Sequence, residues 1–159
     1  MSLTGTVDLS QNDLTEFSPL LCELTNLNNL ALNDNRITLV PDAISQLTGL
    51  GDLTIGRNQL TTIPESLGEL SNLGSLYLSS NQLSSLPDSL GELSNLYMLF
   101  AGKNRLTTIP DSIASLPNLH QLYLADNQLA TLPAAFRSLP ANCDLHLDRN
   151  PLRTGPGWN

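Results

Sequence analysis

Residues 73–83 read Leu-Gly-Ser-Leu-Tyr-Leu-Ser-Ser-Asn-Gln-Leu, and this arrangement of leucines around one asparagine recurs along the chain. The asparagine returns every 23 residues without a slip in phase. The positions concerned are Asn12, Asn35, Asn58, Asn81, Asn104, Asn127 and Asn150. A fixed period of this length indicates a solenoid, in which each repeat packs only against its neighbours.

The repeat divides the chain into coils, and no insertion interrupts them. The coils begin at Thr4, Leu27, Leu50, Leu73, Leu96 and Leu119, with a partial coil from Asn142. Positions below are numbered from these residues. The sequence therefore predicts a single domain over residues 1–159 without an internal linker, either a whole protein or a fragment of a longer one.

The first half of each coil predicts a strand. Positions four and six are apolar in nearly every coil, as Leu76 and Leu78 illustrate. Alternation with a period of two places these side chains inward and position five outward. Since equivalent strands lie one coil apart and run parallel, we expect about seven short strands in one concave sheet.

The second half of each coil predicts a short helical turn on the convex side. Apolar residues three apart, such as Leu90 and Leu93, favour a turn or two of helix. A proline recurs before them, and we expect it at the first helical position. An acidic residue usually follows, where it faces the positive end of the helix dipole. The prolines and acids are Pro41-Asp42, Pro64-Glu65, Pro87-Asp88 and Pro110-Asp111, with Pro133 lacking the acid.

The asparagine at position nine follows the strand, and its amide offers two donors and an acceptor. We expect it to be buried and to satisfy backbone groups of its own and neighbouring coils. One core position is irregular. Ala101 replaces the usual leucine at position six, so that either its neighbours close in or the strand shifts.

The pattern Leu-x-x-Leu-x-Leu-x-x-Asn-x-Leu-x-x-Leu/Ile-Pro resembles the Ras-suppressor-type leucine-rich repeats. These occur in scaffold proteins such as Scribble and Erbin and in many bacterial proteins. The resemblance covers residues 4–152 and departs from the pattern at Ser18, Asn142 and Pro151. It implies an α/β fold, a right-handed solenoid with strands inside and helical turns outside. For function it implies a protein-binding scaffold and names no partner.

The net charge of the chain argues against two classes of partner. The net charge is −8, with seven Lys and Arg against fifteen Asp and Glu. Binding to phosphates needs clustered cations. The sequence therefore speaks against nucleic acid and against an anionic membrane surface as partners.

Two cysteines, Cys22 and Cys143, lie five repeats apart, too far for a disulfide in a solenoid. The N-terminus lacks the basic and apolar regions of a secretory signal. We therefore expect a reducing compartment, the cytoplasm of the producing cell or of a host.

Aromatic residues collect at the outward position five. Along the coils this position holds Asp8, Ala31, Thr54, Tyr77, Phe100, Tyr123 and His146. Tyr97 and Met98 stand beside the central ring, and position seven is small there. Aromatic patches with methionine are typical of interface hot spots. Stacked rings on neighbouring strands also stabilise a sheet, so a purely structural role stays open.

Cations line one edge of this face, at positions eight and ten. They are Arg57, Lys103 and Arg149, then Arg36 and Arg105. A partner with an acidic segment beside an apolar anchor would fit such an edge, while scattered solvated charges are the simpler reading. The residues predicted to contact a partner are Tyr77, Tyr97, Met98, Phe100, Lys103, Tyr123 and His146.

Signals for catalysis are weak. Asp144, His146 and Asp148 alternate along the last strand, with His120 one coil away, and such a set can bind a metal or act as an acid/base pair. An exposed polar terminal strand is the simpler and preferred account of them. We find no phosphate-binding glycine loop, nucleophile motif or zinc-finger spacing. We expect no enzyme, cofactor or metal site.

The sequence thus predicts a protein–protein interaction scaffold that binds a protein or peptide on its concave face. The alternative is the recognition arm of a larger bacterial effector or signalling enzyme whose catalytic domain lies outside this chain. At the N-terminal end, Val7 and Leu9 fall on an uncapped edge strand. We therefore expect a monomer, or a dimer through that end.

Overall fold

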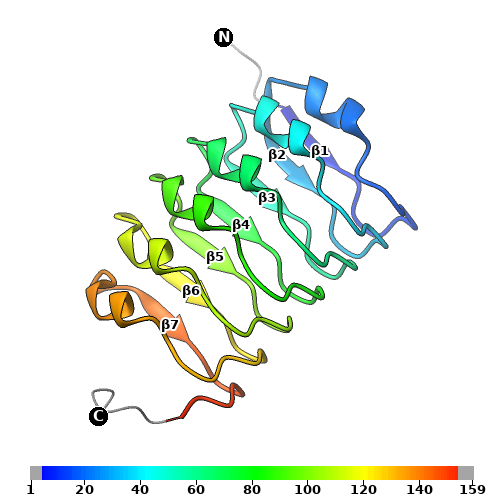
Figure 1. Cartoon of the computed structure of the whole chain (residues 1–159). Coiled ribbons are helices and arrows are strands. Elements are labelled where there is room, and N and C mark those ends of the chain that lie inside the picture. The colour runs from blue at the N-terminus through cyan, green and yellow to red at the C-terminus, as the bar shows by residue number, and fades with distance from the viewer. Residues whose placement is uncertain (1–4, 154–159) are drawn as a thin grey trace.

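The computed structural model describes residues 5–153, which form a solenoid of strands alternating with short 3-10 helices (Figure 1). The strands are β1 (Gly5–Asp8), β2 (Leu27–Ala31), β3 (Asp52–Thr54), β4 (Ser75–Tyr77), β5 (Met98–Phe100), β6 (Gln121–Tyr123) and β7 (Asp144–His146). The helices are η1 (Pro19–Glu23), η2 (Asp42–Gln46), η3 (Glu65–Glu69), η4 (Asp88–Glu92), η5 (Asp111–Ser115) and η6 (Ala134–Ser138).

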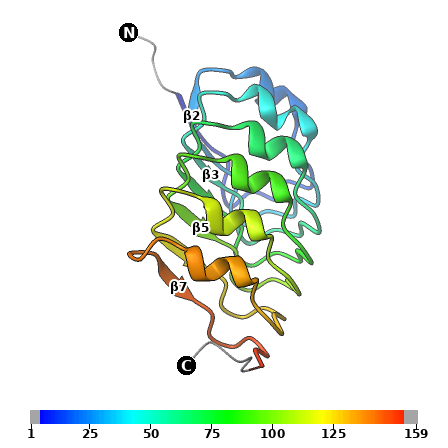
Figure 2. The same ribbon diagram turned by 60° about the vertical axis from the view of Figure 1, so that its left-hand side comes forward.

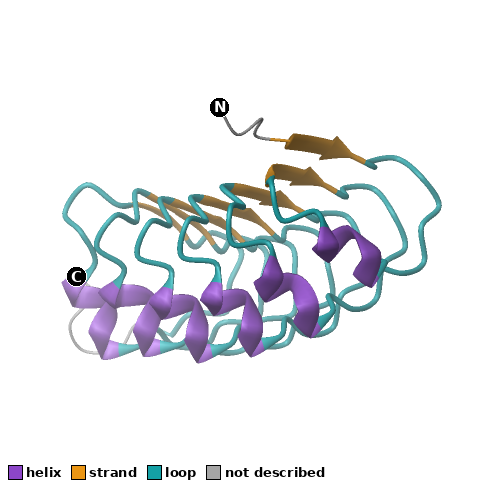
Figure 3. Cartoon of the chain, turned by 90° about the horizontal axis from the view of Figure 1, so that it is seen from above, coloured by secondary structure: helices purple, strands orange, loops and turns teal. Residues whose placement is uncertain are grey.

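The strands form one parallel sheet in chain order, β1 to β7, as the repeat predicted. From Thr6 on, each paired strand residue lies opposite the one 23 positions later, for example Tyr77 opposite Phe100 and Phe100 opposite Tyr123. Gly5 pairs with Leu27, and the register shifts between Gly5 and Thr6. The sheet covers the inner side and the helices stack in a row on the outer side (Figures 2 and 3). Position five therefore faces outward from the same side of every strand.

The core is a column of leucine and isoleucine between these two layers. Positions four and six of the central coils, such as Leu76 and Leu78, are fully buried. Ala101 is also fully buried, and strand β5 keeps its register with both neighbours. The strand therefore does not shift to accommodate the smaller side chain. Among residues 5–153, no helix has the length and apolar character that crossing a membrane requires.

The asparagines form the predicted ladder. In the central coils they are buried, with 7–8% of their surface exposed. Asn81 Oδ1 accepts from the Leu60 backbone N–H of the preceding coil at 3.0 Å. Its Nδ2 donates to the carbonyls of Ile55 in the preceding coil and Leu78 in its own, both at 3.0 Å. One side chain thus satisfies three backbone groups that would otherwise be buried without a partner.

The residue before each asparagine adopts a left-handed backbone. All seven are non-glycine residues with φ between 51° and 62°: Gln11, Asp34, Arg57, Ser80, Lys103, Asp126 and Arg149. The chain turns sharply at this position, which lets the next residue enter the core instead of continuing the strand. The turn also brings the position-eight residues to the margin of the sheet face.

The predicted place of the repeated prolines was wrong by one residue. Pro41, Pro64, Pro87, Pro110 and Pro133 are N-caps, with an extended ψ between 141° and 149°, and the helix begins at the next residue. The proline carbonyl accepts the first 3-10 hydrogen bond, as from Ile44 N to Pro41 O at 3.0 Å. A 3-10 turn closes after three residues, so the acid after the proline occupies the first helical position.

Candidate functional site

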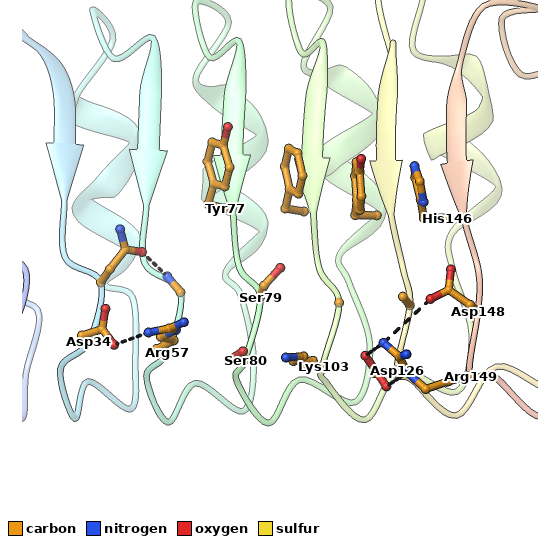
Figure 4. A pocket seen from close by; sticks show the side chains of 16 residues that line it. Asp34, Arg57, Tyr77, Ser79, Ser80, Lys103, Asp126, His146, Asp148 and Arg149 are labelled. Atoms are coloured by element: carbon orange, nitrogen blue, oxygen red, sulfur yellow. Dashed lines mark hydrogen bonds and ion pairs between the residues drawn. The ribbon is translucent and has the colours of Figure 1, made fainter.

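Four rings stand in a stacked column across the concave face of β4 to β7, on the side away from the helices (Figure 4). The centroids of Tyr77 and Phe100 are 4.6 Å apart with planes 6° apart, and those of Phe100 and Tyr123 are 4.5 Å apart at 14°. His146 continues the series at 3.9 Å and 10° from Tyr123. The spacing follows that of parallel strands, since each ring comes from position five. These four residues are called the ring column below.

A shallow groove of about 560 Å³ runs along the ring column towards the carboxyl ends of the strands. Small side chains at position seven, Ser79, Gly102 and Ala125, lie between the rings and the turns. The position-eight turns, among them Lys103, form its other margin (Figure 4). The groove thus has rings on one side, a low floor, and charged residues on the other side.

Tyr97 and Met98 lie on the opposite side of the ring column from the groove. Tyr97 has 41% of its surface exposed, and its hydroxyl lies 3.0 Å from Ser75 Oγ. Its ring covers Gly74, where an added Cβ would come within 2.6 Å of Tyr97 Cε1. The Tyr77 hydroxyl donates to Met98 Sδ at 3.4 Å. Both predicted residues therefore adjoin the ring column, but neither lines the groove.

Three of the five cations of the predicted edge pair with carboxylates of the preceding coil. Arg57 Nη1 lies 3.3 Å from Asp34 Oδ1. Arg36 pairs with Asp13 at 2.7 Å.

Arg149 makes a two-point contact with Asp126, through Nε to Oδ1 and through Nη2 to Oδ2 at 2.6 Å. This guanidinium also lowers the pKa of Asp126 below its ordinary value. Within residues 5–153, only Lys103 and Arg105 of the predicted edge have no carboxylate within 4.0 Å.

On the concave face of the N-terminal coils, polar side chains hydrogen-bond to one another and to the backbone. Asn29 Nδ2 donates to Asp52 Oδ2 at 2.8 Å. Asn33 Nδ2 donates to Thr54 Oγ1 at 2.8 Å, and Asn33 Oδ1 accepts from the Gly56 N–H at 2.7 Å. Because most of these polar groups are already paired, the ring column is the part of this face that gains most from being covered.

The last strand does not form the candidate metal site. His146 Nε2 lies 3.0 Å from Asp144 Oδ2 but without hydrogen-bond geometry, and the ring stacks on Tyr123. Asp148 lies 3.8 Å from Arg149 instead. His120 Nδ1 donates to the Asn118 carbonyl at 2.5 Å. No group of three or more metal-ligating side chains occurs within residues 5–153.

The cysteines show no sign of activation. Both are free thiols, Cys22 fully buried and Cys143 half-buried. Burial raises the pKa of each thiol, and Asp144 raises that of Cys143 further. A nucleophilic cysteine requires the opposite shift.

Of the seven residues predicted to contact a partner, the structure brings five to the groove: Tyr77, Phe100, Lys103, Tyr123 and His146. Sequence reasoning missed the carboxylates at position eight, Asp34 and Asp126. The sequence did contain a signal for these ion pairs, because each aspartate lies 23 residues, or one full repeat, before an arginine.

A family model for the leucine rich repeat matches residues 25–83, 48–106 and 94–152. Among solved structures, a leucine-rich repeat protein of Leptospira interrogans superimposes with a TM-score of 0.89 at 36% identity, over 92% of this chain. An internalin of Listeria monocytogenes superimposes with a TM-score of 0.79 at 26% identity, over 91% of this chain.

The present chain covers only 38% of the Leptospira chain and 40% of the internalin. No curated protein matches it. The overlapping matches of the family model extend over most of the sequence, and the solenoid agrees with them. This chain belongs to the leucine-rich repeat family.

Proposed function

We propose that this domain binds a protein or peptide partner on its concave face, centred on the ring column. Leucine-rich repeat domains generally act as protein-binding scaffolds and are typically non-catalytic. The observation that carries the proposal is the half-exposed stack of Tyr77, Phe100, Tyr123 and His146 beside a groove.

Energetics favour a binding role over a purely structural one. The rings cover one another's faces but leave their edges to solvent, so a partner that covers those edges removes apolar surface from water. Planar, rigid side chains also lose little conformational freedom on binding, which is why they dominate hot spots. Around them, the groove offers Lys103 as a cation, while Tyr97 and Met98 extend the apolar surface on the other side.

Charge supports a protein partner over nucleic acid or an anionic membrane. The chain carries −8, and three of the cations at the groove margin and beside it are neutralised by carboxylates. A polyanion would meet few free cations on this face.

The test is affinity capture with a double variant, Phe100→Ala with Tyr123→Ala. The variant should keep the fold, since both side chains point away from the core, and lose the partners that the wild type captures. The matched control is Leu20→Ala with Leu39→Ala, which removes two apolar side chains that are 69% and 60% exposed elsewhere on the surface. Equal capture by the wild type and the ring variant would refute the proposal.

A second candidate is the recognition arm of a larger bacterial effector or signalling enzyme. It is favoured by the length of the matched structures, of which the chain covers 38% and 40%. Sequencing the complete reading frame at the native locus decides between the two. An adjacent catalytic domain supports the arm, and its absence supports the scaffold. In either case we propose action in a reducing cytoplasm, of the producing cell or of a host, which cell fractionation tests.

A further inference from the structure

We propose that the partner presents a cationic side chain, arginine above all, that stacks on the free face of Tyr77 and pairs with the carboxylate of Asp52. This inference rests on the proposed function and names the chemistry of one contact within it.

The ring column ends at Tyr77, and this end is open. Phe100 covers one face of the Tyr77 ring at 4.6 Å. On the other side the residue in register is Thr54, which is much smaller than a ring. Thr54 Oγ1 is occupied by the Asn33 amide at 2.8 Å. A planar group of a partner therefore finds space above Thr54, where it would add one more layer to the stack.

Asp52 stands beside this space. It lies two residues before Thr54 on the same strand, so that both side chains point to the same face of the sheet. Its Oδ2 accepts from Asn29, while Oδ1 accepts no hydrogen bond from any residue between 5 and 153. Burial raises the pKa of the Tyr77 phenol, and the neighbouring Tyr97 and Asp52 raise it further.

Two other carboxylates near the ring column already have arginine partners. Asp34 pairs with Arg57, and Asp126 pairs with Arg149. Asp144 lies 3.0 Å from His146 Nε2. Among the described residues, the Asp52 carboxylate hydrogen-bonds only with the neutral Asn29 and has no cation within 4.0 Å. At the Tyr77 end of the ring column, the charge of Asp52 thus remains for a partner.

Arginine fits this site better than the other charged side chains do. The guanidinium is planar and weakly hydrated, stacks on aromatic faces, and donates to a carboxylate at the same time. The net charge of −8 also favours approach of a cationic segment over an acidic one. The competing occupant is an acidic side chain at Lys103, on the next coil.

Panning of a random peptide display library tests the inference. The proteins are the wild type, Asp52→Asn, Phe100→Ala with Tyr123→Ala, and the control Asp88→Asn, which makes the same charge change on the convex side. We expect arginine to be enriched among peptides selected by the wild type and by Asp88→Asn. Asp52→Asn should still select peptides, but without that enrichment.

A second arm uses acetylarginine amide as probe, with its neutral isostere acetylcitrulline amide, and follows NMR shifts of the Thr54 methyl and the Tyr77 ring. Only the arginine probe should shift them. Loss of one charge-assisted contact should weaken its binding about tenfold in Asp52→Asn. Tyr77→Phe should retain binding because the face remains, and Tyr77→Leu should lose it.

The outcomes separate the two proposals. Peptides that depend on Phe100 and Tyr123 but show no arginine preference, or an acidic preference that Lys103→Ala abolishes, overturn the Asp52 site and leave the proposed function standing. Peptides selected equally by the wild type and the ring variant overturn the proposed function. In that case the arginine probe decides on the Asp52 site alone, and equal shifts from both probes overturn it.

Discussion

At the scale of single residues, the buried asparagine is the feature on which each coil depends. We expect Asn81→Ala to lower the free energy of unfolding by about 1–3 kcal/mol, because it leaves the Leu60 N–H and the Ile55 and Leu78 carbonyls short of a partner in the core. Urea denaturation measures the change.

The first coil supplies the control. Asn12 is exposed and, among residues 5–153, donates only to the carbonyls of Leu9 and Ser10. Asn12→Ala should therefore change stability by no more than about 0.5 kcal/mol. An equal loss from both substitutions would show that the ladder does not act through burial.

Single residues also show where sequence reasoning ends. The burial of Asn81 and the outward direction of Phe100 follow from phase alone, because a fixed period assigns each position one environment. The pairing of Arg57 with Asp34 depends on rotamers of two long side chains on different coils, which no local pattern specifies. Likewise, the closeness of Tyr97 to Ser75 depends on the absence of a side chain at Gly74.

At the scale of elements, the turns after the strands decide what the groove presents. Their left-handed residues bring the side chains at position eight of successive coils beside one another. Opposite charges on neighbouring turns then pair, as in Asp126 with Arg149. The helices lie close to where they were predicted. Each begins one residue later than expected, because the proline is its N-cap and not its first residue.

The pairing of these turns has a measurable dependence on pH. Arg149 lowers the pKa of Asp126 from its ordinary 3.8, with a smaller contribution from Lys103. A lowered pKa in the folded state means that the pairing stabilises the fold above pH about 4 and is lost as the pH falls through the folded pKa. Arg149→Ala should return the Asp126 pKa towards 3.8, as followed by NMR of its carboxyl carbon.

Arg105→Ala is the matched control, because it removes the same charge two coils before Arg149 without touching Asp126. It should leave the Asp126 titration where it is in the wild type. A similar rise in both variants would assign the shift to the general field of the chain and not to the contact.

At the scale of the whole molecule, the solenoid is a one-dimensional stack. Within residues 5–153, each strand has no strand neighbours other than those of the adjacent coils, and each helix has no helix neighbours other than the adjacent ones. The number of coils and the direction of every side-chain row followed from the repeat. Whether the N-terminal edge pairs with another chain did not follow from the repeat. Strand β1 has a neighbouring strand on one side only, so the period does not set its environment. A monomer, or a dimer through that edge, stays a prediction.

Nearest-neighbour packing predicts that the site of a core substitution decides how far its effect spreads. Leu99→Ala empties a fully buried position in the middle of the stack and should cost about 2–5 kcal/mol. Leu145→Ala changes a half-buried residue in β7, the last strand, and should cost less. Hydrogen exchange should show lost protection in the coils on both sides of Leu99, but only near the C-terminal coil for Leu145. Because a globular core unfolds as one unit, equal loss of protection across all coils in both variants would contradict the one-dimensional description.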